Sequence, residues 1–293
     1  MGSQSASERS MSYLITGGAR GIGRGLARSL LSRGHRVFLL DNNKTELENT
    51  LSEASSWASS SSGAQSGSGY DGQSKGALVN LADREQLKYG FSEASKFFDG
   101  KLDVLINNAM HTPHVWSEGK IMENPDDEVI PVEWDLKVAI GLTAPFLLSR
   151  LCVPLLKAAG TQGGNSRPGC IINISSTRAY QAEENHEAYS AVKAGILGLT
   201  QSMAVSLGHR HGIRVNAIVP GWISVDNESA GAHHNAKWDQ NLTEQDHKWH
   251  PAGRVGKVED IVKAVNFLVD SDFVTGDQIV IDGGVSRKMV YPE

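Results

Sequence analysis

Three side chains of this sequence could together carry out acid–base chemistry: Tyr189, Lys193 four positions later, and Ser176 upstream of both. Residues four apart share one face of a helix. A nearby ammonium favours a phenolate, so we expect the pKa of Tyr189 to lie below its usual value of about 10. Such a tyrosine exchanges a proton with an alcohol or carbonyl oxygen near neutral pH, and the Ser176 hydroxyl could hold the same oxygen. A surface lysine beside a packed tyrosine gives the same spacing, so this pair alone does not decide.

A glycine-rich turn, Thr16-Gly-Gly-Ala-Arg-Gly-Ile-Gly23, lies between the first expected strand and the first expected helix. Glycines let the backbone turn tightly and approach a pyrophosphate, and the helix N-terminus offers free N–H groups. In the first strand–helix turn, this pattern predicts a dinucleotide site. The expected cofactor-binding residues here are Gly17, Arg20, Gly21, Ile22 and Gly23.

Asp41, at the end of the second expected strand, predicts which dinucleotide is bound. Its carboxylate can accept hydrogen bonds from the ribose hydroxyls and would repel a 2′-phosphate, which favours NAD over NADP. Arg20 could pair with a 2′-phosphate and argues the other way, and Asp41-Asn-Asn would also suit a turn or helix cap. Asp41 carries more weight, so we predict NAD, with NADP less favoured.

Apolar runs alternate with helical patterns, which predicts a single α/β domain over residues 11–293 with a doubly wound parallel sheet of seven strands. We expect strands at residues 12–16, 36–40, 77–81, 102–106, 170–174, 214–219 and 278–281. Helices are expected after Gly21, over 131–159 with a bend near Pro145, around Tyr189 and over 258–269. The Ser/Gly-rich residues 52–76 predict an extended, mobile surface loop, and residues 225–251 a substrate loop.

The composition is that of an ordinary globular protein: 293 residues, 40% hydrophobic and 21% charged. A net charge of −5 gives no reason to expect nucleic acid or an anionic membrane as partner. No apolar run approaches the roughly 18 residues of a membrane span. The two cysteines lack the spacing of a disulfide framework or a metal site. Residues 1–10 are polar and Ser-rich, so we expect a disordered tail, no secretory signal and a cytoplasmic protein.

Together, the motifs resemble the short-chain dehydrogenase/reductase family over nearly the whole chain. They are Thr16–Gly23, Asn107-Asn-Ala109, Ser176, Tyr189 with Lys193, Asn216, Pro220-Gly221 and Asp282-Gly-Gly284. The resemblance implies a single-domain Rossmann fold and NAD(P)-dependent interconversion of a secondary alcohol and a carbonyl. It also implies a homodimer or homotetramer acting on a small molecule.

The resemblance also assigns roles to residues. Tyr189 would be the general acid/base, Lys193 would lower its pKa and bind the nicotinamide ribose, and Ser176 would orient the substrate oxygen. Further cofactor contacts are implied for the adenine at Asn80 and Leu81, the adenine ribose at Asn108 and Ala109, and the nicotinamide at Pro220, Gly221 and Ile223. Asn216 and Asp282 are expected to hold the backbone.

The chain departs from the family pattern at three site positions. Gly141 stands where the family often has an asparagine that helps hold a helix kink and a water leading to the lysine. Met110 replaces the usual glycine after Asn-Asn-Ala and adds bulk near the cofactor. Val225 replaces a threonine, so Ser224 or a later residue would have to bond the carboxamide. Residues 52–76 are also long for the family.

The expected substrate side is polar and aromatic, which suggests a polar or mixed substrate. It carries His111, His114, His233, His234, Trp238, His247, Trp249 and His250. The pairs His111/His114 and His247/His250 could bind a metal, but solvated loop histidines are the default and we expect no metal. Two other functions stay open: a cofactor-binding sensor or interaction protein that has lost catalysis, and dehydratase, epimerase or lyase chemistry in the same site.

Overall fold

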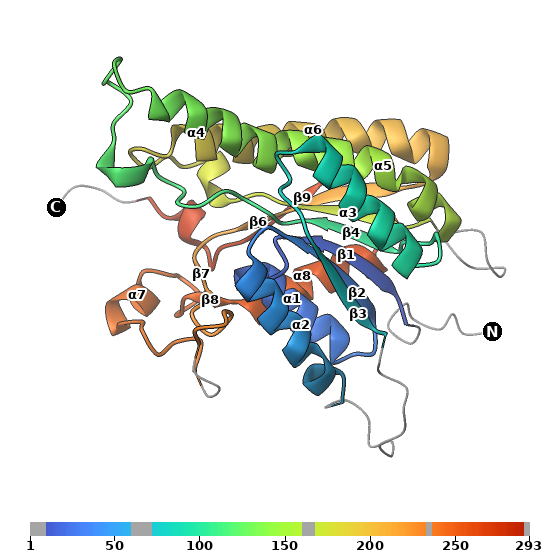
Figure 1. The fold of residues 1–293 in the computed structure, drawn as a ribbon. Helices are drawn as coiled ribbons and strands as arrows, with labels where there is room; N and C mark the ends of the chain where they lie inside the picture. The colour runs from blue at the N-terminus through green and yellow to red at the C-terminus, as the bar shows by residue number, and fades with distance from the viewer. Residues whose placement is uncertain (1–9, 60–71, 160–167, 233–235, 290–293) are drawn as a thin grey trace.

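The computed structural model describes residues 10–59, 72–159, 168–232 and 236–289. Its centre is a seven-stranded parallel sheet with the order β3-β2-β1-β4-β5-β6-β9 (Figure 1). The strands are β1 (Ser12–Thr16), β2 (Arg36–Asp41), β3 (Ser74–Leu78), β4 (Val104–Asn107), β5 (Cys170–Ile174), β6 (Arg214–Pro220) and β9 (Gln278–Ile281). A separate two-stranded sheet joins β7 (Ile223–Ser224) to β8 (Gly256–Lys257). The predicted doubly wound parallel sheet is therefore confirmed.

Helices cover both faces of the sheet (Figure 1). One layer contains α1 (Gly21–Leu31), α2 (Lys44–Ser59) and α8 (Val258–Asp270). The other contains α3 (Arg84–Phe97), α4 (Val129–Val138), the π-helical turn η3 (Ala139–Thr143), α5 (Ala144–Ala159) and α6 (Glu187–His211). Short elements complete the described chain: η2 (Ser117–Gly119), η4 (Thr177–Ala179), α7 (Glu244–Lys248) and η5 (Val285–Arg287).

Alternate residues of each strand face opposite layers, because side chains along a strand point in turn to the two sides. In β1, Tyr13 and Ile15 belong to the cluster under α1 and α8, and Leu14 to the cluster under α3 and α5. Both faces of a parallel sheet are covered, so these strands are apolar throughout. That is why the central strands were predictable from continuous apolar runs.

The third strand and the Ser/Gly-rich segment differ from expectation. The strand is Ser74–Leu78, three residues earlier than the predicted 77–81. It is one of the two edge strands of the sheet, and only Ala77 of its five residues is buried, so no continuous apolar run marks it. The predicted loop at 52–76 is wrong for residues 74–76, which belong to β3, and for residues 52–59, which extend α2. In α2, Ala54 and Ala58 continue a helical spacing and are buried. Residues 60–71 of that segment and 1–9 of the predicted tail lie outside the described residues.

The long helix is interrupted just before Pro145 rather than bent at it. Proline has no N–H to donate to the carbonyl of Gly141 four residues earlier, so the α-helical ladder cannot continue there and a wider turn, η3, forms. The whole stretch Val129–Ala159 has the length and apolarity of a membrane span, contrary to the prediction that no run approaches one. Its side chains Leu148, Cys152 and Leu156 are buried in the core beneath the sheet, as in the core helix of a globular protein.

Candidate active site

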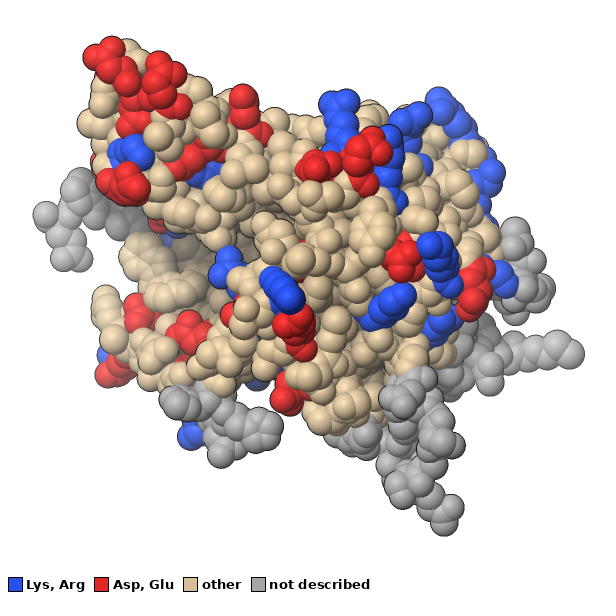
Figure 2. Space-filling model, viewed as in Figure 1, with Lys and Arg blue, Asp and Glu red and all other residues tan. Residues whose placement is uncertain are grey.

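A cleft of about 1270 Å³ opens at the carboxyl ends of the parallel strands. It is the hollow in Figure 2 between the projection that precedes α4 and the part of the chain that carries α7. In sheets of this winding, ligands bind where the strand order reverses, here between β1 and β4. The two strand ends are tied there, because the Thr16 hydroxyl accepts the N–H groups of Asn108 at 3.0 Å and Ala109 at 3.1 Å.

The glycine turn has two kinds of glycine. Gly17 and Gly21 have positive φ angles of 62° and 60°, a conformation that L side chains rarely adopt. At Gly21 an added Cβ would meet only Val225, at 4.0 Å, so this glycine faces the open cleft. At Gly23 an added Cβ would lie 2.1 Å from the Gly17 carbonyl oxygen. Gly23 therefore allows close packing of the turn and does not line the cleft, unlike Gly17, Arg20, Gly21 and Ile22.

Asp41 lines the cleft at the end of β2, and its carboxylate is held in place by the backbone. Its two oxygens accept the N–H groups of Ala19 at 3.0 Å and Asn43 at 2.9 Å. The competing Arg20 donates to the Thr112 hydroxyl at 2.9 Å, across the cleft mouth. Of the pair expected at the adenine, Leu81 lines the cleft, whereas Asn80 is exposed and bonds the Ala82 N–H at 3.1 Å instead. Asn80 is thus a cap of the following turn in this structure.

Ser176, Tyr189 and Lys193 come together on the cleft wall. Ser176 follows β5, while Tyr189 and Lys193 lie one turn apart on α6. Burial raises the pKa of Tyr189, and the Ser176 hydroxyl and the charge of Arg178 oppose this. The predicted lowering of the Tyr189 pKa is therefore wrong for this state, because desolvation outweighs the effects of Ser176 and Arg178.

Lys193 points past the tyrosine ring to the end of β5. Its Nζ lies 5.5 Å from the Tyr189 ring centroid and donates to the Ile174 carbonyl at 2.9 Å. Burial lowers the pKa of Lys193 to about 8. The ammonium is therefore poised to lose its proton much nearer neutrality than a solvated lysine.

His114 also contacts Tyr189, a contact that sequence reasoning had not identified. The two rings stack with centroids 4.2 Å apart, and burial lowers the pKa of His114 to about 4, so the imidazole is neutral at pH 7. The loop carrying it is fixed by the fully buried Lys137, whose Nζ donates to the Val115 carbonyl at 3.0 Å and pairs with Glu133 at 3.1 Å.

The departures at Met110 and Gly141 are one feature. A Cβ on Gly141 would lie 2.5 Å from Val192 Cγ1 and 2.7 Å from Met110 Sδ. The methionine thus fills space beside the π-helical turn that the family pattern gives to an asparagine side chain. Met110 itself lines the cleft.

The segment after β6 supplies the opposite wall. Pro220, Gly221 and Ile223 line the cleft, and a Cβ on Gly221 would lie 2.7 Å from Asp282 Cβ. Ser224 is buried and its hydroxyl bonds the Trp238 carbonyl, so it is not the replacement for the missing threonine.

The two residues expected to hold the backbone do so. Asn216 donates to the Val274 carbonyl and accepts the Asp277 N–H, and Asp282 accepts the N–H groups of Gly284 and Ser286.

The predicted substrate loop contributes several residues to the cleft: Val225, Glu228, Ser229, Gln245, Asp246, Trp249 and His250. His233 and His234 lie outside the described residues. His247 and His250 use ring nitrogens for backbone contacts, with the Val255 N–H at 3.3 Å and the Asp246 carbonyl at 2.9 Å. Within the described parts of the chain, no three metal-ligating side chains converge. Sequence reasoning missed Arg178, Glu228 and Ser229, since nothing in their spacing marks them.

Known proteins are similar to this chain over almost its full length. A family model described as enoyl-(acyl carrier protein) reductase matches residues 17–286. An uncharacterized oxidoreductase of Thermotoga maritima is 34% identical over 287 residues, covering 96% of this chain and 97% of that protein. The 3-oxoacyl-(acyl-carrier-protein) reductase FabG of the same organism is 29% identical, covering 93% of this chain and 96% of that protein. A solved apo SCOR enzyme from Clostridium thermocellum is 31% identical, with a TM-score of 0.73 and coverage of 97% and 96%.

Proposed function

The chain belongs to the short-chain dehydrogenase/reductase family, and we propose that it interconverts a secondary alcohol and a carbonyl with Tyr189 as general acid/base. Members of this family are NAD(P)-dependent oxidoreductases, and this chain is one. The observation that carries the finer proposal is that Ser176, Tyr189 and Lys193, all buried, line the same cleft.

The cleft fits a nicotinamide dinucleotide. Its 1270 Å³ exceeds the roughly 300–1,000 Å³ of a pocket for one drug-sized ligand, as two bound molecules would require. Gly17 and Ile22 would hold the diphosphate beside Gly21, whose N–H is paired with the Glu228 carbonyl. Asp41 would hold the adenine ribose, and Pro220, Gly221 and Ile223 the nicotinamide, whereas Gly23 would support the turn and Asn80 would not contact the adenine. When bound, the cofactor donates or accepts the hydride.

The protein's own part is to handle the proton. In the reducing direction, Tyr189 donates its phenolic proton to the substrate oxygen while the Ser176 hydroxyl hydrogen-bonds the same oxygen. Because burial raises the pKa of Tyr189, the phenol holds its proton at neutral pH and is available as an acid. Lys193 stabilises the phenolate that forms, and its pKa of about 8 suits proton exchange with it. Oxidation runs these steps in reverse.

NAD is the proposed cofactor. The fixed Asp41 carboxylate would lie beside the ribose and repel a 2′-phosphate, and the Arg20 guanidinium donates to the Thr112 hydroxyl. Titration with NADH and NADPH, followed by nicotinamide fluorescence, tests this: NADH should bind more tightly. Replacing Asp41 by Ala should reduce the difference between the NADH and NADPH affinities. Tighter binding of NADPH than of NADH to the wild type would contradict the proposal.

The substrate is proposed to be a small polar molecule, because Arg178, Gln181 and His186 line the cleft near Tyr189. Exposed apolar side chains on the helical layer, Phe146 of α5 and Val205 of α6, support a homodimer or homotetramer. Cys152 and Cys170 are buried and are not joined in a disulfide, as is usual in the cytoplasm, where we place the protein.

Replacing Tyr189 by Phe tests the proposed chemistry. Removing the hydroxyl should lower kcat by at least 10²–10⁴-fold, with NADH affinity changed by less than about twofold. The variant is assayed on a panel of polar alcohols and ketones beside the wild type. Full activity of Y189F would falsify the assignment. Cofactor binding by the wild type without turnover would favour a sensor, and product without net cofactor turnover would favour lyase or epimerase chemistry.

A further inference from the structure

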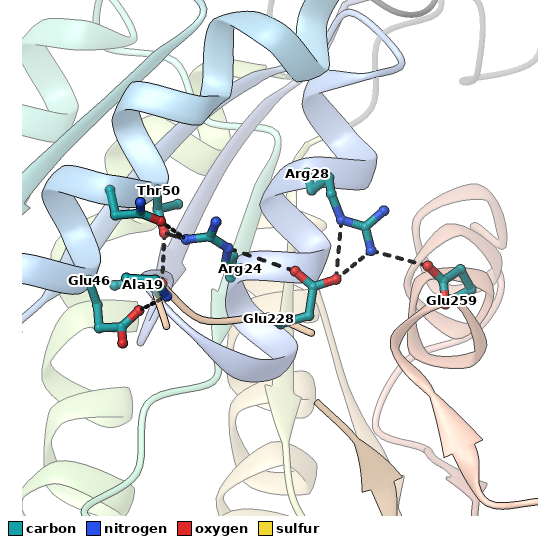
Figure 3. Close-up of polar contacts among 9 residues, drawn as sticks. Ala19, Arg24, Arg28, Glu46, Thr50, Glu228 and Glu259 are labelled. Atoms are coloured by element: carbon teal, nitrogen blue, oxygen red, sulfur yellow. Dashed lines mark hydrogen bonds and ion pairs between the residues drawn. The ribbon is translucent and has the colours of Figure 1, made fainter. Parts of the chain in front are cut away.

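A buried carboxylate, Glu228, ties the segment after β7 to the helix that begins at the glycine turn (Figure 3). Its side chain is 2% exposed, and its Oε1 accepts from the Arg28 guanidinium through Nε, at 3.1 Å, and Nη2. Its other oxygen lies 3.9 Å from Arg24 Nε. Burial raises the pKa of Glu228, and both arginines oppose this. A carboxylate at this depth needs such partners, so the arrangement fixes where the segment lies.

The surrounding groups extend this connection to the ribose end of the cleft. Arg24 also donates to the Thr50 hydroxyl at 2.7 Å, and Thr50 donates to the Ala19 carbonyl at 2.7 Å (Figure 3). Ala19 in turn donates its N–H to Asp41. On the far side, Arg28 reaches Glu259 of α8 at 3.2 Å. Glu228 is thus the anchor of a network that includes the glycine turn itself.

The backbone carbonyl of Glu228 also accepts one of the N–H groups of the glycine turn. The Glu228 carbonyl accepts the Gly21 N–H at 2.7 Å, and the Ala230 N–H donates to Glu46 at 2.7 Å. Gly21 stands at the N-terminus of α1, where backbone N–H groups bind anions. The Gly21 amide is therefore already paired and does not face an incoming phosphate as a free donor.

Between these two backbone contacts lies Ser229, which lines the cleft. Across the described ranges, its hydroxyl makes no hydrogen bond. The other nearby hydroxyl, that of Ser224, donates to the Trp238 carbonyl, and Val225 has no hydroxyl. Ser229 is thus the hydroxyl that this segment presents beside the anion-binding end of α1.

We propose that Ser229 donates a hydrogen bond to the cofactor's diphosphate, and that Glu228 is a positioning residue that holds it there. The inference rests on the proposed function, because it requires a dinucleotide in the cleft. It assigns to Ser229 a donor role that Gly21 and Val225 cannot fill.

The first test measures ligand binding to Ser229→Ala, with NADH and with adenosine, which shares the adenine and ribose but has no phosphate. NADH affinity should fall about tenfold, as for loss of a hydrogen bond to a charged group, while adenosine affinity should stay unchanged. S229T keeps a hydroxyl and should restore NADH affinity. Unchanged NADH binding in S229A, or equal losses for NADH and adenosine, would overturn the role of Ser229.

The second test addresses Glu228. Glu228→Gln should weaken NADH binding. Adding S229A to E228Q should reduce NADH affinity by less than S229A does in the wild type, because the serine is no longer held in place. Glu259→Gln is the matched control: it removes the other carboxylate that contacts Arg28, outside the cleft, and should leave NADH affinity unchanged. Additive losses in E228Q/S229A would overturn the positioning role. If E228Q does not fold, the S229A and S229T results decide the diphosphate contact by themselves.

The result also separates this inference from the function it rests on. A wild type that binds NADH, with S229A binding it equally well, would leave the dehydrogenase proposal standing and reject this one. A wild type that binds neither NADH nor NADPH would reject both.

Discussion

Replacing Gly141 by Asn, the residue that the family pattern has at this position, should destabilise this protein. A Cβ there would approach Val192 Cγ1 to 2.5 Å and Met110 Sδ to 2.7 Å, and real side-chain carbons do not come that close. The methionine end can move, but Val192 is β-branched and its χ1 is stiff. The larger amide would have to enter the same space, so α6 or the π-helical turn would have to shift.

The size of the effect follows from two opposing terms. Overpacking a filled core costs about 1–3 kcal/mol, whereas replacing a helical glycine by asparagine, a poor helix former, returns at most about 0.5 kcal/mol. The net loss for G141N should therefore be about 0.5–2.5 kcal/mol. Met110→Ala removes the sulfur and opens part of the space. The loss for M110A/G141N should thus be smaller than the sum of the single losses, by about 0.5 kcal/mol or more.

Urea denaturation of the wild type, both single variants and the double variant measures these free energies, with unchanged m-values as evidence that the same transition is compared. G141A is the control, since it adds the clashing carbon without the amide and should lose less than G141N. Strictly additive effects of M110A and G141N, or a G141N variant as stable as the wild type, would refute the conclusion that the two departures compensate each other.

Two further outcomes are expected from the site's ionisable groups. Lys193→Met should raise stability at pH 7 by up to about 3 kcal/mol, because burial lowers the pKa of Lys193 from 10.5 to about 8 and the folded protein bears the cost of a buried ammonium at every pH below that. The stability difference between K193M and the wild type should shrink between pH 8 and 10.5, because there the unfolded chain still holds the lysine proton and the wild type gains stability as the pH rises. Thermal denaturation of both proteins at pH 7 and pH 10 measures this difference. A difference that does not change with pH would contradict the lowered pKa of Lys193. His114→Ala should lower kcat about 2–10-fold by removing the ring stacked on Tyr189, whereas H114F, which keeps a ring, should retain most activity; equal losses would show that the stack does not position the tyrosine.

The parts of the fold that sequence predicted well are those whose residues carry a local signal. The buried central strands are continuous apolar runs, and β1 and β5 begin and end at the expected residues. The edge strand β3 has a solvated side and no such run, so its position was missed. In α2 the serines of a low-complexity stretch obscured the helical spacing of Ala54 and Ala58, both of which are buried in the core.

The candidate site shows the same division. The residues of the glycine turn and Ser176, Tyr189 and Lys193 lie at spacings that elementary geometry links to a strand end or a helix face. Glu228 is held by Arg28, 200 residues away in the chain, and no spacing rule connects them. Met110 and Gly141 read as two separate departures in the sequence, and only their contact shows that each makes room for the other.

Because the π-helical turn η3 joins α4 to α5, the number of residues in this helical stretch determines how α4 is oriented relative to α5. Successive helical residues are rotated by about 100°, and a π turn holds one residue more than an α turn in the same rise. Deleting a single residue within Ala139–Thr143 would turn α4 by about that angle relative to α5. Glu133 and Lys137 would then point away from the loop that carries His114. The additional residue of the π turn thus sets the rotation of α4 relative to α5, and single-residue insertions or deletions here should disturb the candidate active site more than most substitutions do.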